Sequence, residues 1–313
     1  MTPRAAPMVG VIVPTRNKAA RLRLMLRSLA HQDPVPDTEV IIVDDGCTDD
    51  TADVVAAAVH ELVMPLRVVA GPRRGRAAAR NCGATATTAR RVLFLDDDIL
   101  VAPGFLAAHA DPAHAVPLIE PGPGGARDLL VHGPLRESPR AETIVAHTPA
   151  DPYAAVVGGD YGRTVQNALE QLVTGMASGQ YPRFAPWLAG VGANMSVPAD
   201  AWRALGGFDE EFGTTWGCED LEFGYRLVAA GCVPAVAAGA QGFHLTHARP
   251  QRWAEHKINL DRFARLHPVA EVRSLSGLLC PRGSPEAYLK ALGTTEASTP
   301  ESPLGTPTGG SPQ

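Results

Sequence analysis

Three consecutive carboxylates, Asp96, Asp97 and Asp98, directly follow a run of bulky apolar residues at positions 92–95. Such a run is typical of a buried parallel strand, and ligands of open α/β sheets bind at the carboxyl ends of the strands. Closely spaced carboxylates repel one another unless a cation lies among them, and their oxygens suit Mg²⁺ or Mn²⁺. The sequence therefore predicts a divalent-metal site at this strand end, with a solvated acidic turn as the alternative.

A second predicted strand, at positions 39–43, ends in Asp44 and Asp45. Because parallel strands share one carboxyl edge, we expect these carboxylates near the first three, in a pocket for amide donors, ribose hydroxyls or metal-bound phosphate. The alternative is an Asp-Gly turn before a helix. Small residues at 75–79 allow a helix to approach the sheet closely, from which Arg80 could reach an anionic or carbonyl group. This stretch is not Gly-x-Gly-x-x-Gly, which counts against a dinucleotide site.

Two further groups of residues in the second half of the chain could do chemistry. Glu219 and Asp220 stand at the predicted start of a helix, beside glycines and an aromatic residue, which suits a general base held against a sugar ring. Their alternative role is a favourable interaction with the helix dipole. His244 and His247 could complete a metal site with an aspartate from elsewhere, although a single histidine is more often structural.

The elements that must position these residues follow from hydrophobic periodicity. Strands are predicted at 9–13, 39–43, 66–70 and 92–95, and helices alternate with them. This alternation predicts an α/β fold with a parallel sheet covered on both faces. Further along, the sequence predicts strands at 128–131 and 194–197, and the helices expected there are at 165–177, 199–205, 220–230 and 251–266.

Composition limits the possible functions and the location of the protein. The 313 residues carry a net charge of −5, so no nucleic-acid partner is expected. Five scattered cysteines without zinc or redox spacing suggest a reducing compartment. Residues 1–7 are too short and polar for a signal peptide, and 227–240 is too short for a membrane span, so we expect a cytoplasmic protein without an integral membrane segment. Of the last twenty residues, fifteen are Ser, Thr, Pro or Gly, which predicts a disordered tail over 284–313.

Taken together, these stretches resemble the family 2 glycosyltransferases of the GT-A fold. The shared motifs are Val-Ile-Val-Pro-Thr-Arg-Asn at 11–17, Ile-Val-Asp-Asp-Gly at 42–46, Ala-Arg-Asn-Cys-Gly at 79–83, Phe-Leu-Asp-Asp-Asp at 94–98, Gly-Ala-Asn-Met-Ser at 192–196 and Gly-Gly-Phe-Asp at 206–209. Trp-Gly-Cys-Glu-Asp at 216–220 is similar to the version in galactosyltransferases and chondroitin polymerases. The resemblance covers about residues 9–250, but 109–185 carries no family motif that we can place.

The resemblance implies roles for individual residues. Asp44 or Asp45 would read the base of the nucleotide, most often uracil, and Asn194 would contact the donor sugar. Asp98 would bind the metal, with Asp96 nearer the ribose. The residues assigned to the nucleotide sugar are Pro14, Thr15, Arg16, Asp44, Asp45, Arg80, Asp96, Asp97, Asn194 and Trp216.

The implied reaction is a metal-dependent transfer of a sugar, with inversion, from a UDP sugar to an acceptor hydroxyl. Asp220 would be the general base and Glu219 would position the sugar or acceptor, while His247 and His244 would join Asp98 on Mn²⁺ or Mg²⁺. One direct displacement inverts the anomeric centre, so a single base is enough. Arg16 and Cys47 depart from the family pattern near the nucleotide and leave the base preference open.

The same resemblance divides the domain into a nucleotide-sugar-binding half, 1–108, and an acceptor and catalytic half, 109–283. The acceptor would be a carbohydrate, a peptide or a small molecule of a bacterium. Four aromatic residues could form an acceptor platform, a lid or simply core: Tyr181, Phe184, Trp187 and Trp216.

Two other functions fit the sequence less well. A sugar-phosphate nucleotidyltransferase normally has a Gly-rich loop with Arg and Lys after its first strand, whereas this chain has Pro-Thr-Arg-Asn at 14–17. A non-catalytic nucleotide-sugar-binding protein would have no need to keep both Asp98 and Asp220.

Overall fold

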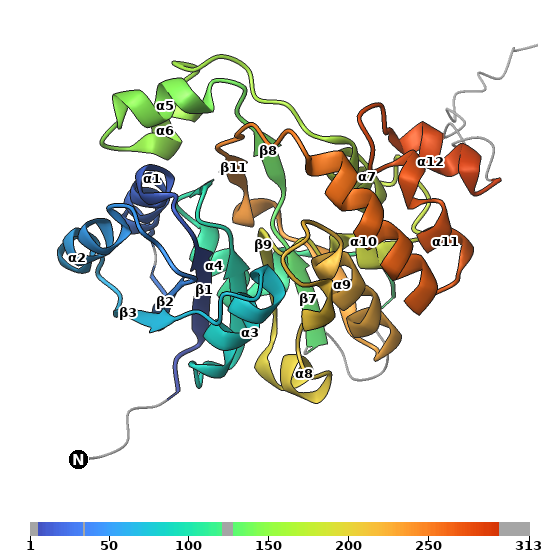
Figure 1. The fold of residues 1–313 in the computed structure, drawn as a ribbon, viewed down its shortest axis with the longest axis horizontal. Coiled ribbons are helices and arrows are strands. Elements are labelled where there is room, and N and C mark those ends of the chain that lie inside the picture. The colour runs from blue at the N-terminus through green and yellow to red at the C-terminus, as the bar shows by residue number, and fades with distance from the viewer. Residues whose placement is uncertain (1–5, 34, 121–127, 294–313) are drawn as a thin grey trace, which may run out of the picture.

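An eight-stranded sheet forms the centre of the computed structural model, which describes residues 6–33, 35–120 and 128–293 (Figure 1). Its strand order is β3-β2-β1-β4-β9-β7-β10-β6. The strands are β1 Val9–Thr15, β2 Thr38–Asp44, β3 Leu66–Ala70, β4 Arg91–Leu95, β6 Val116–Pro117, β7 Leu129–His132, β9 Asn194–Pro198 and β10 Val233–Val236. The first four pair in parallel, as predicted, whereas β9 runs antiparallel to both β4 and β7.

The sheet is covered by helices on both faces because its strands are apolar on both sides. In β1, Val11 and Val13 pack in one buried cluster with Leu22 of α1 and Val54 of α2, while Ile12 packs in the other with Ala79 of α3. The first face carries α1 Ala19–Ala30, α2 Thr51–Glu61 and α4 Phe105–Ala110. The second face carries α3 Arg76–Thr85, α7 Ala168–Ser178, α8 Ala199–Ala204 and α9 Glu219–Ala229. Helix α3 ends at Thr85.

A second, three-stranded sheet begins directly after the acidic turn. Its strands are β5 Ile99–Val101, β11 Gly242–His244 and β8 Leu135–Glu137, in the order β5-β11-β8. His244 pairs with Ile99 on one side and with Glu137 on the other. This small sheet joins segments that lie more than a hundred residues apart, and helices α5 Ala141–His147 and α6 Pro152–Val157 pack against it (Figure 1).

Three helices complete the side of the molecule beyond α9: α10 Arg252–Leu266, α11 Ala270–Arg273 and α12 Pro285–Ala291 (Figure 1). The predicted start of the disordered tail at 284 is wrong. Ser284 caps α12 by accepting a hydrogen bond from the Ala287 N–H, Pro285 occupies the first turn, and Tyr288 is completely buried. The rest of the predicted tail, 294–313, lies outside the described residues.

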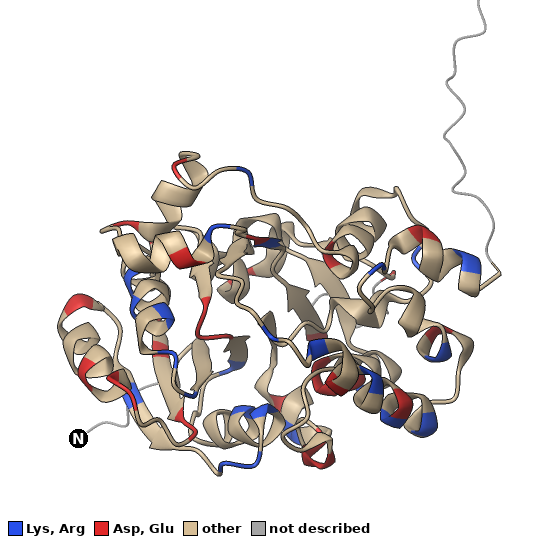
Figure 2. Ribbon diagram, turned by 45° about the horizontal axis from the view of Figure 1, so that its top comes forward, with Lys and Arg blue, Asp and Glu red and all other residues tan. Residues whose placement is uncertain are grey.

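In the view of Figure 2, Lys and Arg are interspersed with Asp and Glu over much of the described chain. None of the helices that the structure describes is long and apolar enough to cross a membrane.

The position of α9 depends on close backbone contact at Gly224. A Cβ added there would lie 2.6 Å from the Trp187 carbonyl oxygen and 2.9 Å from Gly190 Cα. Backbone atoms give way poorly, so we expect Gly224→Ala to lower the free energy of unfolding by about 1–3 kcal/mol, despite alanine's better helix propensity. Chemical denaturation measures this effect. Gly104→Ala is the matched control, because no atom lies within 4 Å of its added Cβ; equal stability of the two variants would contradict the prediction.

Candidate active site

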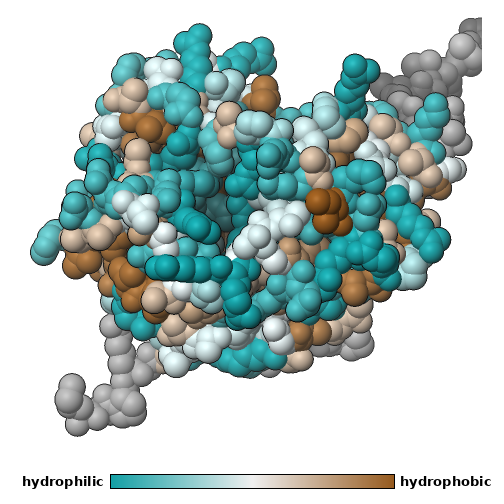
Figure 3. Space-filling model, viewed as in Figure 1, coloured by the Kyte–Doolittle hydropathy of each residue, from teal (hydrophilic) through white to brown (hydrophobic). Residues whose placement is uncertain are grey.

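Two adjoining cavities open at the carboxyl edge of the parallel strands. The larger has a volume of about 350 Å³ and the smaller about 250 Å³. Figure 3 shows a hollow in this face of the molecule, bordered mainly by hydrophilic residues. Five residues line both cavities: Lys18, Arg76, Asp96, Trp216 and Arg249. Since the cavities share these walls, ligands bound in them would touch.

The smaller cavity contains most of the residues that the sequence assigned to the nucleotide. Its walls are formed by the end of β1, the turn after β2, the acidic turn after β4 and the start of α3. The predicted residues that line it are Pro14, Thr15, Arg16, Asp45, Asp96, Asp97 and Trp216. Of the two candidates for reading the base, Asp45 lies in the cavity, whereas Asp44 accepts hydrogen bonds from the Gly46 and Cys47 N–H groups and shapes the turn.

The structure brings the three predicted metal ligands together in the larger cavity. One potential ligand atom each from Asp98, His244 and His247 lies within 4.8 Å of the others. The Asp98 Oδ2 is 3.6 Å from His244 Nε2 and 3.4 Å from His247 Nδ1. Asp98 Oδ1 and His247 Nδ1 are buried without a hydrogen-bond partner. One carboxylate oxygen and two imidazole nitrogens form a donor set that fits Mn²⁺, so these residues fit a divalent ion.

Carboxylates around His244 orient it toward this cluster. Its Nδ1 contacts Glu137 Oε2 at 2.7 Å, which leaves Nε2 facing Asp98. Although burial alone would lower it, Asp98 and Glu137 raise the pKa of His244 to about 10. The surroundings that hold a proton on His244 are the same surroundings that would attract a metal cation, so metal and proton would compete for this nitrogen.

Lys18 lies between two of the three consecutive aspartates. Its ammonium donates to Asp97 Oδ1 at 3.0 Å and to Asp98 Oδ2 at 2.8 Å. Burial alone would raise the pKa of Asp98, but His244 and Lys18 hold that pKa well below its usual range. Burial and Asp98 raise the pKa of Asp97 to about 6, despite Lys18, and Asp97 also accepts a 2.7 Å hydrogen bond from the Thr15 hydroxyl. Asp97 therefore fixes the side chains of Thr15 and Lys18, which both line the smaller cavity.

Arg80 connects the acidic turn after β4 to Glu219, one of the predicted catalytic pair. This completely buried side chain donates to Asp96 Oδ1 at 2.9 Å and to Glu219 Oε1 at 2.8 Å. Burial alone would lower the pKa of Arg80, but Asp96 and Glu219 together raise it. Arg80 thus acts as a fixed cation that sets the distance between the end of β4 and the start of α9.

Asp220, the predicted general base, lines the larger cavity at the start of α9. Its Oδ2 accepts a hydrogen bond of 2.9 Å from the Gly192 N–H, which fixes the orientation of the carboxylate. Burial and Glu219 raise the pKa of Asp220 to about 6, although Arg80 and two backbone N–H groups act in the opposite direction. A carboxylate with a raised pKa is a stronger base, which suits proton abstraction from a hydroxyl.

Asn194 does not lie where the resemblance put it. Its side chain is completely buried, donates to the carbonyl oxygens of Gly133 and Ala240, and contacts His109 Nε2 at 2.9 Å. It lines neither cavity. The prediction that Asn194 contacts the donor sugar is therefore wrong; the residue joins β9 to the loops beside it.

The four aromatic candidates separate into core and cavity residues. Tyr181 and Trp187 are buried in the main core, and Phe184 packs on Tyr288 with ring centroids 5.5 Å apart. Trp216 lines both cavities. Only one of the four thus lies where it can contact a ligand in these cavities.

Sequence reasoning missed several charged residues of the site. Lys18, Arg76, Arg249 and Arg252 line the cavities, and Glu137 orients His244. Arg76 stands inside the motif that singled out Arg80, and Arg249 follows His247 by two positions, so proximity to motifs was a usable signal for both. Glu137 carried no such signal, because it lies in the region without a family motif.

Comparison with known proteins gives two family matches. Residues 10–118 match the model for glycosyl transferase family 2, and residues 172–248 match the model for the N-terminal domain of galactosyltransferase. Validoxylamine A glucosyltransferase of Streptomyces hygroscopicus subsp. limoneus is 35% identical over 272 residues, which cover 84% of this chain and 57% of that protein. Chondroitin synthase of Escherichia coli is 28% identical over 244 residues, 75% of this chain and 34% of that protein. The chain thus spans at most about three fifths of the curated relatives that it matches.

Solved structures share the architecture. The mannosyltransferase PcManGT from Pyrobaculum calidifontis, in complex with GDP-Man and Mn²⁺, has a TM-score of 0.58 at 21% identity and covers 94% of this chain and 77% of its own. Residues 1–349 of TarS from S. aureus, in complex with UDP-GlcNAc, have a TM-score of 0.56 at 17% identity and cover 91% and 79%. These likenesses identify the fold as the GT-A glycosyltransferase fold.

Proposed function

Because the chain carries a glycosyl transferase family 2 domain at residues 10–118, we propose that it is an inverting glycosyltransferase that moves a sugar from a nucleotide sugar to an acceptor hydroxyl. One observation carries the proposal. A potential metal site of Asp98, His244 and His247 shares a cavity with Asp220, and that cavity adjoins a second one lined by Thr15. The donor we expect is a UDP sugar.

The donor would span both cavities. Its nucleoside would occupy the smaller one, between Thr15 and Asp45, and its diphosphate would lie at the shared walls beside Arg76 and Arg249. Asp98, His244 and His247 would hold a divalent ion, Mn²⁺ or Mg²⁺, that offsets the charge on the departing nucleoside diphosphate. The sugar would then extend into the larger cavity, because the metal ligands and Asp220 line that cavity together.

Asp220 would remove the proton from the acceptor hydroxyl as its oxygen attacks the anomeric carbon. The Gly192 N–H holds the carboxylate, and Arg80 holds the neighbouring Glu219, so the base is fixed before the substrates bind. A single displacement inverts the anomeric centre and needs no nucleophile from the protein. This arrangement supports an inverting reaction.

Thermal-shift measurements with nucleoside diphosphates and nucleotide sugars, each with and without Mn²⁺, test the proposal directly. A ligand that binds the folded state stabilises it by mass action and so raises Tm. At a ligand concentration of a hundred times Kd, the free energy of unfolding rises by about 2.7 kcal/mol. We expect a Mn²⁺-dependent rise with UDP compounds, and the sugar nucleotide with the largest rise becomes the donor for acceptor screens. No metal-dependent rise with any nucleotide would overturn the proposed function.

The rate of transfer should depend on pH through the ionisation of Asp220. Only the deprotonated carboxylate can accept a proton, so kcat should fall as the pH drops through the pKa of about 6 and reach about a tenth of its plateau one pH unit below. Steady-state rates at saturating donor and Mn²⁺ measure this limb. Doubling the Mn²⁺ concentration should leave the midpoint unchanged, which separates Asp220 from the metal ligands; an unaltered rate at pH 5 would contradict the prediction.

A further inference from the structure

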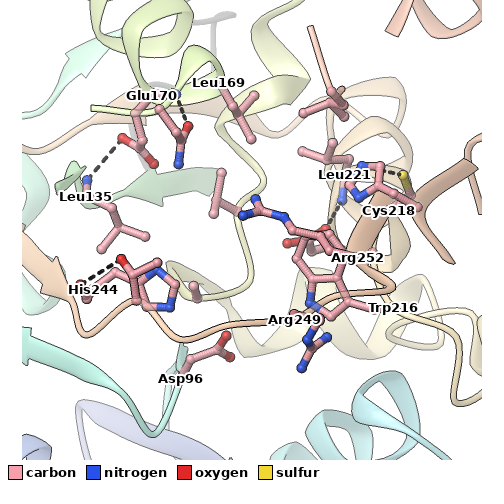
Figure 4. Close-up of a pocket in the computed structure, with 18 of the residues that line it drawn as sticks. Asp96, Leu135, Leu169, Glu170, Trp216, Cys218, Leu221, His244, Arg249 and Arg252 are labelled. Carbon is pink, nitrogen blue, oxygen red and sulfur yellow. Dashed lines mark hydrogen bonds between the residues drawn. The ribbon is translucent and has the colours of Figure 1, made fainter. Parts of the chain in front are cut away.

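Arg252, the first residue of α10, lies against two indole rings. Its guanidinium carbon lies 4.8 Å from the ring centroid of Trp216 and 4.8 Å from that of Trp253. In Figure 4 the side chain extends across the middle of the larger cavity, with Trp216 on one side and the Asp96–His244 region below. Such cation–π contacts restrain the guanidinium while leaving its N–H groups available to a ligand.

This guanidinium has no carboxylate partner among the described residues, and its Nε is buried without a hydrogen-bond partner. Glu137, the carboxylate that acts on it through space, is already occupied by His244, Thr246 and Asn167. Burial lowers the pKa of Arg252, so its position is electrostatically unfavourable without an anion. A half-buried, unpaired arginine in a cavity wall indicates a missing anionic partner.

Arg252 does not line the smaller cavity, which we assign to the nucleoside. Arg76 and Arg249 line both cavities, whereas Arg252 lines only the larger one. The larger cavity also contains Asp220, the base that faces the acceptor under the proposed function. Under the proposed function, Arg252 therefore lines the cavity in which the donor sugar and the acceptor would meet, and not the smaller cavity assigned to the nucleoside.

We propose that Arg252, which lies against Trp216 and Trp253, binds an anionic group, phosphate or carboxylate, carried by the acceptor. This inference rests on the proposed function, because that function makes the larger cavity the acceptor site. A planar guanidinium fork pairs with either group through two parallel hydrogen bonds. The proposal thus narrows the acceptors from carbohydrates, peptides and small molecules in general to those with a negative charge near the reacting hydroxyl.

Isothermal titration of the full chain tests the proposal with three probes: inorganic phosphate, glucuronate and neutral glucose. The protein is first saturated with UDP and Mg²⁺, so that the diphosphate position beside Arg76 and Arg249 is filled. We expect saturable binding of at least one anion. Arg252→Gln should weaken it about tenfold or more, because hydrogen bonds to a charged group are lost, while the affinity for UDP and Mg²⁺ stays unchanged.

Arg265→Gln is the matched control, since Arg265 is exposed on the same helix and should bind the anions as the unaltered protein does. Preference for phosphate or for glucuronate identifies the group. The proposal is overturned if neither anion binds saturably, or if Arg252→Gln binds them as Arg265→Gln does. Failure of UDP and Mg²⁺ to bind would instead contradict the proposed function, and the anion titrations of the two variants without nucleotide would still decide the role of Arg252.

Discussion

Replacing Asp220 by asparagine should reduce kcat for sugar transfer about a thousandfold while the protein still binds its nucleotide sugar. The amide keeps the size of the carboxylate but cannot accept the proton of the acceptor hydroxyl, and general-base catalysis contributes about 10²–10⁴ in rate. Donor affinity should change less than about threefold, because Asp220 lies in the larger cavity and not among the nucleotide residues of the smaller one. Product assays and donor titrations measure the two quantities separately.

The control for this experiment is Asp261→Asn, an exposed aspartate on α10 that pairs with Lys257 and should leave both quantities unchanged. A non-catalytic nucleotide-sugar binder would show no activity to lose. Equal loss of transfer and donor binding in Asp220→Asn would also count against the base assignment, because it would indicate a damaged site instead of a missing base.

Removing the Asp98 carboxylate should have the second large effect, on metal affinity. Disturbing even the groups around a metal ligand costs about 10- to 100-fold in affinity, so we expect Asp98→Ala to weaken Mn²⁺ binding at least 100-fold. The Mn²⁺-dependent part of donor binding should disappear with it, since Asp98 is the carboxylate among the three potential ligands. Titration of Mn²⁺ in the presence of UDP measures both effects.

Because Asp98 also pairs with Lys18, its loss affects more than a metal ligand. His247→Ala removes a second potential ligand, whose Nδ1 is buried without a hydrogen-bond partner 3.4 Å from Asp98 Oδ2, and it should weaken Mn²⁺ binding with little effect on Tm. Asp160→Ala, at an exposed position, serves as the unaffected control. Unaltered Mn²⁺ affinity in both Asp98→Ala and His247→Ala would refute the metal assignment.

The residues of the smaller cavity could be predicted because their positions depend on local signals. Apolar runs identify the strands, parallel pairing puts their carboxyl ends on one edge, and Thr15, Asp45 and Asp96 follow directly from that geometry. Each of these residues lies within one or two positions of a strand end, so no long-range contact had to be known.

The rest of the site depends on pairings that periodicity does not reveal. His244 reaches Asp98 because β11 lies between β5 and β8, and the same pairing brings Glu137 from a segment without a recognisable motif. Asn194 shows the opposite problem. Its motif matches, but its buried amide donates to the carbonyl oxygens of Gly133 and Ala240 and is not available to a ligand in either cavity. A matching motif predicts a residue's position in the fold better than its contacts.

One wall of the larger cavity is formed by a short segment just before α12. Residues 278–281 and Gly283 belong to this wall, and they stand between α11 and α12, far along the chain from the strands that face the donor. Tyr288 anchors the segment through its buried ring and a 2.7 Å hydrogen bond from its hydroxyl to the Glu271 carbonyl oxygen. Under the proposed function, exchanging this short anchored segment would reshape one wall of the acceptor cavity and leave the strands that line the smaller cavity unchanged.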